Sequence, residues 1–118
     1  MKENVVKDKS YRFAIRIVNL YKVLGERHEY VLSKQLLRSG TAVGAMIKEG
    51  LQAQSKADFI HKLSIALKEA CESEYWIMLL KDTTYIKETE YESILPDCQE
   101  LIKLLTCIIK TAKNTRDR

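Results

Sequence analysis

Residues 56–82 read KADFIHKLSIALKEACESEYWIMLLKD, and they carry the clearest structural signal in the chain. Small or apolar residues recur in this stretch at alternating steps of four and three, at Phe59, Leu63, Ala66, Ala70, Ser73, Ile77 and Leu80. This spacing lines up one face of an α-helix and is typical of a helix packed inside a bundle. Ser55, a favoured N-cap residue, stands just before the stretch, and Asp58 follows it at capping-box spacing. The sequence therefore predicts a long helix over about residues 56–82.

Three more helices follow from similar patterns. The same steps recur near the C-terminus, at Ile94, Cys98, Leu101, Leu105, Ile108 and Ala112, and predict a helix over about residues 88–114. Within it, Pro96 either kinks the helix or marks the first turn of its main segment. The N-terminal helix is expected over about residues 8–25, with Asp8 or Ser10 as its N-cap and Gly25 as its stop. The remaining helix is expected over about residues 30–52.

The size and composition of the chain fit one helical domain. The chain has 118 residues, of which 46% are hydrophobic, and it holds only four glycines and one proline. A β-sandwich or barrel needs turn residues at short intervals, which this sequence lacks. Short connections between long helices favour antiparallel neighbours. We therefore expect a single domain over residues 1–118 that is all-α, an up-down-up-down antiparallel four-helix bundle.

The composition of the N-terminal helix indicates an oligomer. Its polar residues form one narrow stripe of Arg12, Arg16, Asn19 and Lys22, and almost every other position from Tyr11 to Leu24 is apolar. One bundle covers only one face of each helix, so a second apolar face is expected to meet another subunit. The sequence predicts a homo-oligomer for this reason.

The middle of the helix expected over residues 30–52 is a run of small and β-branched residues, SGTAVGA at positions 39–45. Helix propensity does not favour such a run. Its structural interpretation is that small residues let a neighbouring backbone approach closely, with Gly40 as a possible bend. A phosphate-binding loop is the alternative, but no Lys-Ser/Thr pair follows a glycine and no strand precedes the run.

Several classes of protein are disfavoured. No segment has the roughly 18 consecutive apolar residues of a membrane span, and residues 1–9 lack an apolar signal-peptide core, so we expect a cytoplasmic protein. No helix carries the Glu-x-x-His motif of di-iron bundles, and neither histidine has a partner at metal spacing. Ser39, Ser64 and Ser73 have no triad histidine at an arguable spacing. We therefore expect no enzyme activity, catalytic residue, metal or cofactor, with Cys71, Cys98 and Cys107 as small core hydrophobes.

Arg38 is the most distinctive candidate residue, because it interrupts a small and apolar segment. If the following turn centres near Gln54, antiparallel packing brings Arg38 within reach of Glu69 or Glu72. A buried or half-buried arginine needs such a carboxylate. A structural ion pair of Arg38 with these glutamates is the favoured interpretation, and phosphate binding by Arg38 is the alternative.

Residues 32–50, LSKQLLRSGTAVGAMIKEG, resemble the bacterial four-helix bundle proteins encoded in intervening sequences of 23S ribosomal RNA genes. The Gln-x-x-Arg-Ser block that starts at Gln35, followed by Glu49-Gly50, is quite specific. The likeness extends over about residues 11–109 through Asp58-Phe59, Ile65-Ala66, Glu72 and Tyr75-Trp76. Ala42 and Met46 stand where the family usually has a serine and an asparagine, and we interpret these changes as repacking of a buried seam.

The resemblance implies an up-down bundle that assembles into a ring-like homopentamer. Its relatives include the accessory variability determinants of diversity-generating retroelements, which look like basic barrels that bind nucleic acid and a reverse transcriptase. For this chain the resemblance therefore implies three kinds of partner: other copies of the same chain, RNA or DNA, and, in a retroelement context, a reverse transcriptase. Many members carry a ribosomal-protein label.

The charge pattern suggests where a nucleic acid would bind. In the expected bundle the start of the first helix, the turn before residue 56 and the end of the last helix share one end, which holds an excess of basic residues. The candidate phosphate-binding residues there are Lys7, Lys9, Arg12, Lys110, Lys113 and Arg116. The alternative function is a protein-interaction scaffold without a nucleic-acid role. Tyr75 and Trp76 are expected in the core or a subunit interface, with base stacking as the alternative.

Overall fold

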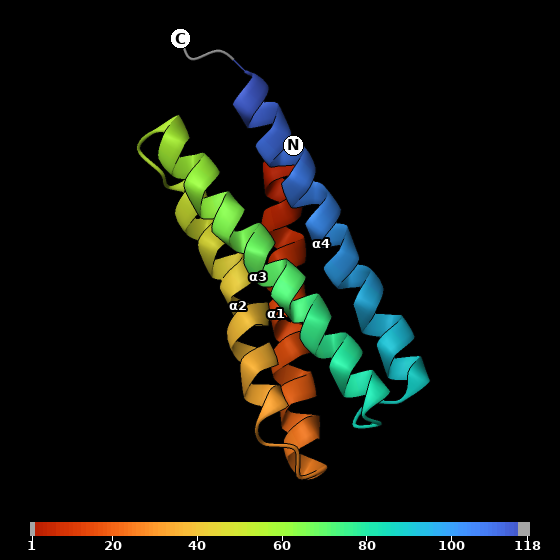
Figure 1. Ribbon diagram of the computed structural model, residues 1–118. Helices are drawn as coiled ribbons and strands as arrows, with labels where there is room; N and C mark the ends of the chain where they lie inside the picture. Colours follow the sequence, from red (N-terminus) through yellow and green to blue (C-terminus); the bar gives the residue numbers. More distant parts are fainter. Residues whose placement is uncertain (1, 116–118) are drawn as a thin grey trace.

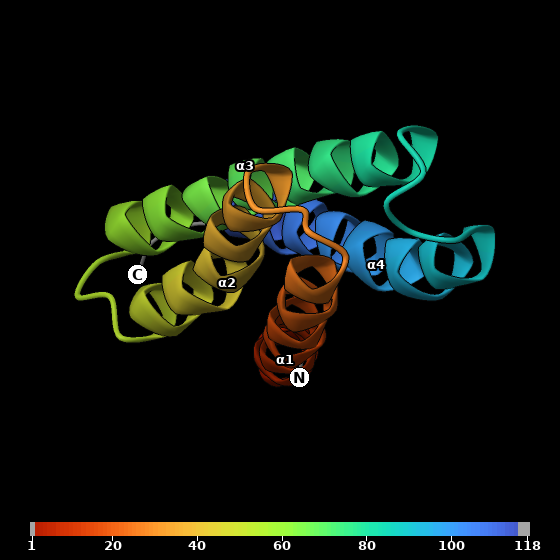
Figure 2. The same cartoon turned by 90° about the horizontal axis from the view of Figure 1, so that it is seen from below.

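Four α-helices make up the computed structural model, which describes residues 2–115: α1 (Lys2–Glu26), α2 (Leu32–Leu51), α3 (Lys56–Asp82) and α4 (Glu88–Asn114). Both α1 and α3 pack against α2 and α4, so the helices form a closed ring of antiparallel neighbours. The α1–α2 and α3–α4 connections lie at one end of the molecule, and the α2–α3 connection lies at the other (Figures 1 and 2). The predicted all-α four-helix architecture is confirmed.

The core is built from the stripes that the sequence predicts for α3 and α4. Every member of the α3 stripe from Leu63 to Leu80 is buried, and Phe59 is partly buried at the end of the helix. In α4 the stripe is buried from Ile94 to Ile108. The largest buried side chains of the other two helices include Phe13, Ile17, Leu36 and Ile47. Removal of this apolar surface from water is the main force that holds the helices together.

α1 begins earlier than its capping signals predict. Its first residue is Lys2 rather than Asp8 or Ser10, and neither caps the helix start. Val6 is fully buried in the core, so tertiary packing stabilises the first turns over a polar sequence. Ser10 is buried too, and its hydroxyl donates to the Lys7 carbonyl at 2.9 Å. The stop is also misplaced, because Gly25 lies inside α1 and the left-handed residue beyond the helix is His28, with φ 64°.

α2 begins at Leu32, two residues later than expected; its N-cap residue, Val31, makes no side-chain capping bond, and Glu29 accepts the first N–H groups of the helix instead. The Glu29 carboxylate accepts the backbone N–H groups of Leu32 and Ser33, each at 2.8 Å. Glu29 is buried, and desolvation alone raises its pKa, but the hydrogen bonds from Ser33 and Leu32 outweigh that effect and lower the pKa. Sequence reasoning missed this contact because Glu29 lies two residues before the N-cap position, where side-chain capping is not expected.

Gly40 and Pro96, two residues that disfavour helix, both lie inside helices. A Cβ atom on Gly40 would lie 2.8 Å from Ile17 Cγ1, so the small run in α2 permits the close approach of α1, as its structural interpretation requires. Pro96 lies well inside α4, which runs on from Glu88, so its interpretation as a first-turn residue is wrong. Among the described residues, no helix combines the length and the apolar character needed to cross a membrane.

Candidate functional site

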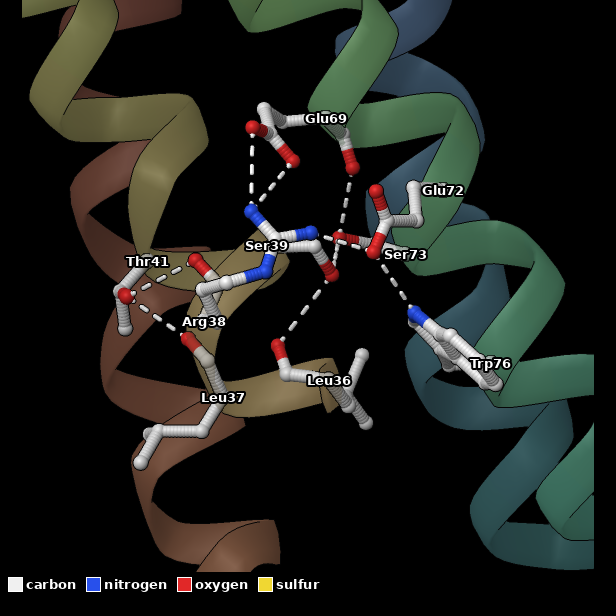
Figure 3. A network of polar contacts seen from close by, with 9 residues as sticks. All are labelled: Leu36, Leu37, Arg38, Ser39, Thr41, Glu69, Glu72, Ser73 and Trp76. Atoms are coloured by element: carbon white, nitrogen blue, oxygen red, sulfur yellow. Dashed lines mark hydrogen bonds and ion pairs between the residues drawn. The ribbon is translucent and has the colours of Figure 1, made fainter. Parts of the chain in front are cut away.

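Arg38 joins α2 to α3 through two carboxylates (Figure 3). Arg38 Nη1 lies 3.1 and 3.2 Å from the two Glu69 carboxylate oxygens, and Nη2 donates to Glu72 Oε2. Trp76 Nε1 donates to the same Glu72 oxygen at 3.0 Å. Hydrogen bonds from Trp76 and Arg38 lower the pKa of Glu72. The pairing expected from the hairpin geometry is thus present.

A second polar contact lies beneath this pair, in the core. The hydroxyls of Ser39 and Ser73 are fully buried and lie 2.8 Å apart, and Ser73 Oγ also donates to the Glu69 carbonyl at 2.8 Å (Figure 3). Each hydroxyl is therefore satisfied by α2 and α3 themselves. Arg38, in contrast, has 50% of its side chain exposed and Glu69 has 17%, so the ion pair lies at the surface of the α2–α3 seam. These contacts link α2 to α3 both at the surface and in the core.

The start of α1, the α2–α3 connection and the end of α4 lie toward one end of the molecule, as the sequence predicts (Figure 1). Lys56 Nζ on α3 donates to the Thr115 carbonyl beyond α4, and Lys2 and Glu3 of α1 line the same depression. We call this the basic end, made of residues 2–12, 48–58 and 110–115. Its exposed cations are Lys2, Lys7, Arg12, Lys48, Lys110 and Lys113, and its exposed carboxylates are Asp8 and Glu49. Of the other predicted binding residues, Lys9 is half-buried and Arg116 lies outside the described residues.

The structure separates the predicted binding residues into groups. Lys7 and Arg12 lie along a surface groove between α1 and α2, where Lys48 joins them from the facing helix. Tyr11, which sequence reasoning did not select, lines the same groove and is 69% exposed. Its spacing of four residues from Lys7 is the sequence signal that places both on one helix face. Lys110 and Lys113 are exposed on the last turns of α4.

Lys9 belongs to a series of polar contacts between α1 and α4. Lys9 Nζ lies 3.2 Å from Glu100 Oε1, and seven residues further along α1 the Arg16 guanidinium donates to Asp97 Oδ2 at 2.6 Å. Arg16 also donates to the Ser93 carbonyl at 3.0 Å. Lys9 is therefore oriented toward a carboxylate of its own bundle, and an outside phosphate would compete with this solvent-exposed ion pair.

The comparisons with known proteins agree with one another. The family model described as 23S rRNA-intervening sequence protein matches residues 2–107. The chain belongs to this family. Its fold matches the crystal structure of a protein of unknown function from the S23 ribosomal protein family of Bacteroides thetaiotaomicron, with a TM-score of 0.91 and 63% sequence identity. That match covers 93% of this chain and 99% of the other. The search of curated proteins gave no match.

In this member of the intervening-sequence protein family, the two residues that depart from the family pattern, Ala42 and Met46, both lie on α2. Met46 is partly buried and packs against the core, and Ala42 is half-buried. The contact of Met46 with the core fits the interpretation of repacking at that position. Among residues 2–115, no group of three or more His, Cys, Asp and Glu side chains is arranged to hold a metal ion.

The three cysteines differ in environment, and their assignment to the core is wrong for Cys71. Cys98 is fully buried, donates to the Ala70 carbonyl at 3.2 Å, and burial raises its pKa to about 12. Cys71 is exposed, because it follows the buried Ala70 and one helical step turns it outward. Cys107 is half-buried, and a hydrogen bond from Lys2 Nζ at 2.7 Å lowers the pKa of its thiol.

Proposed function

We propose that this member of the 23S rRNA-intervening sequence protein family is a non-enzymatic homo-oligomer that binds RNA or DNA weakly and without base specificity through its basic end. The observation that carries the proposal is the excess of exposed cations over exposed carboxylates where the start of α1, the α2–α3 turn and the end of α4 meet. Phosphate contacts by lysine and arginine supply essentially all of the affinity of non-specific nucleic-acid binding.

The polar network of α2 and α3 supports a non-enzymatic role. Glu69 and Glu72 are both held by Arg38, and the hydroxyls of Ser39 and Ser73 bond to each other in the core. A nucleophilic serine needs a general base within hydrogen-bond reach, whereas the Ser39 and Ser73 hydroxyls contact each other and backbone carbonyls. We therefore assign these side chains to helix pairing.

The oligomer contact is proposed away from the basic end. On α1, Val18, Tyr21 and Val23 are half-buried within the bundle, whereas Val5, Tyr11 and Ile15 are exposed. Large apolar side chains are exposed in the opposite half of the molecule, at Tyr30, Val31, Tyr75 and Met78, with exposures from 45 to 70%. An interface there leaves the basic ends of all subunits free for nucleic acid. The pentamer is preferred on the family resemblance alone.

A titration tests the nucleic-acid part of the proposal. Fluorescence anisotropy with labelled single- and double-stranded RNA and DNA at low salt should detect binding, with an affinity that falls steeply as salt is added. A variant with Lys7, Arg12, Lys48, Lys110 and Lys113 changed to glutamine should bind much more weakly. Its matched control changes Lys22, Lys34 and Lys87, exposed lysines outside the basic end, and should bind as the wild type does.

Two results would replace this proposal with the scaffold function. One is the absence of binding to any of the four nucleic acids, and the other is equal binding by the basic-end variant and the wild type. Light scattering tests the oligomer independently, since the wild type should have several times the monomer mass. Tyr75→Lys and Met78→Lys should lower that mass, whereas a monomeric wild type contradicts the oligomer.

A further inference from the structure

The groove between α1 and α2 is lined by small side chains at its base and by charged side chains along its edges. It has a volume of about 700 Å³ and is open to solvent. Thr41, Gly44 and Ala45 line it from α2, and none of these side chains is large. A Cβ atom on Gly44 would lie 3.4 Å from the Ser10 carbonyl oxygen, so the two helices are close there and the floor is backbone and small side chains.

The three cations around the groove have no ion pair within residues 2–115. Lys7 and Arg12 come from α1 and Lys48 comes from α2, and all three are exposed. Lys9 and Lys62, by contrast, each contact a glutamate on a neighbouring helix. Asp8 is the one carboxylate among the described residues that line the groove. The net charge of the groove therefore favours an anionic ligand.

Tyr11 adds an aromatic surface between these cations. Two other exposed tyrosines have a ring neighbour, since Tyr30 lies edge-on to His28 and Tyr75 lies edge-on to Trp76. Among the described residues Tyr11 contacts no other ring, although 69% of its surface is exposed. An aromatic side chain flanked by cations is the combination that binds single-stranded nucleic acid, because bases stack on the ring and phosphates contact the cations.

We propose that this groove takes a single-stranded nucleic acid, with a base stacked on Tyr11 and the adjoining phosphates held by Lys7, Arg12 and Lys48. The proposal rests on the nucleic-acid binding proposed above and specifies its ligand and site. A duplex presents its phosphates but keeps the faces of its bases covered, so it uses the cations without the ring. The groove thus prefers single strands over duplexes of the same length.

Fluorescence anisotropy with a labelled oligothymidylate and with a mixed-sequence duplex of equal length tests this preference. Tyr11→Leu should weaken single-strand binding about tenfold and leave duplex binding unchanged, and Tyr11→Phe should retain the wild-type affinity. Lys48→Gln should weaken both and reduce the single-strand salt slope by about 0.7, the value for one lost phosphate contact. Tyr85→Leu, a change at an exposed tyrosine in the α3–α4 connection, and Lys22→Gln are the matched controls and should match the wild type.

A second readout separates stacking from a structural role. An oligonucleotide with 2-aminopurine at one position should lose fluorescence on binding to the wild type and to Tyr11→Phe, but not to Tyr11→Leu. Equal affinity for single strand and duplex, or unchanged binding by Tyr11→Leu, would overturn this inference while leaving the proposed function intact. Absence of binding to both ligands would overturn the two together. A change of oligomer mass in Tyr11→Leu would assign the ring to a subunit interface and also overturn the inference.

Discussion

Arg27 Nη1 and Nη2 donate to the two carboxylate oxygens of Glu90 at 2.9 and 2.8 Å, and this bidentate pair joins the end of α1 to the first turn of α4. Glu90 Oε1 also accepts the Lys87 backbone N–H at 2.7 Å. The Arg27 hydrogen bonds, with the Lys87 contact, lower the pKa of Glu90 from 4.5 to about 2. The Glu90 carboxylate therefore links the end of α1 to α4 and also caps the start of α4.

The first prediction concerns this carboxylate. Glu90→Gln should lower the free energy of unfolding by about 1 to 2 kcal/mol near neutral pH. Because the folded pKa lies below the unfolded one, the contribution of Glu90 is fully present above pH 4.5 and is lost as the pH falls toward about 2. Urea unfolding across this range should therefore show the difference from wild type shrinking to zero. Glu92→Gln, at an exposed position on α4, should change little, and a pH-independent loss in Glu90→Gln would contradict the assignment.

The second prediction concerns Arg38. Arg38→Ala should cost only about 1 kcal/mol, because half of the side chain is exposed and water screens the pair. Arg38→Lys should cost less, since an ammonium still attracts the carboxylates but cannot form both sets of hydrogen bonds. A double-mutant cycle with Glu69→Gln measures the coupling, and Lys34→Ala is the exposed control on α2. A loss of several kcal/mol would instead indicate that another subunit covers the pair.

Two glycines in helices are expected to respond oppositely to the same change. Gly40→Ala should destabilise the protein by about 1 to 3 kcal/mol, because the new Cβ atom would lie 2.8 and 2.9 Å from the two γ-carbons of Ile17 and 3.3 Å from its Cβ. Gly25→Ala should stabilise it by about 0.5 to 1 kcal/mol, since nothing lies within 4 Å and alanine favours a helix. Thermal unfolding of both variants at one protein concentration checks the pair of signs.

The α3–α4 connection offers a further matched pair. Thr84 has φ 67°, a left-handed conformation that is costly for a β-branched residue, so Thr84→Gly should stabilise the protein by about 1 kcal/mol. Thr83 has φ −96° and donates its hydroxyl to the Leu79 carbonyl at 2.7 Å. Thr83→Gly should therefore destabilise by about 1 kcal/mol. Equal effects in urea unfolding would show that backbone strain at Thr84 is not the cause.

Ion pairing was partly predictable from sequence. The position of Arg38 relative to Glu69 and Glu72 follows from the length of one helical hairpin, because the connection between α2 and α3 is short and sets their register. The pairing of Arg27 with Glu90 joins residues that are distant in the chain, and no local spacing relates them. Glu29 was missed for a different reason, since its capping role depends on a turn that folds its carboxylate back onto α2.

The alternating four-and-three spacing was enough to establish the fold class, because burial of one stripe per helix requires that spacing and little else. Chain direction and short connections were enough to bring the basic residues to one end. Only the tertiary structure determined which of these basic side chains contact a carboxylate and which lie beside one another at the surface. Lys9 and Lys48 are alike in sequence terms, but contact with Glu100 orients Lys9 along the α1–α4 seam, whereas α2 presents Lys48 beside Tyr11. Contacts across helices determine where a charged side chain points and what competes with a ligand for it, and those contacts exist only after the helices have packed.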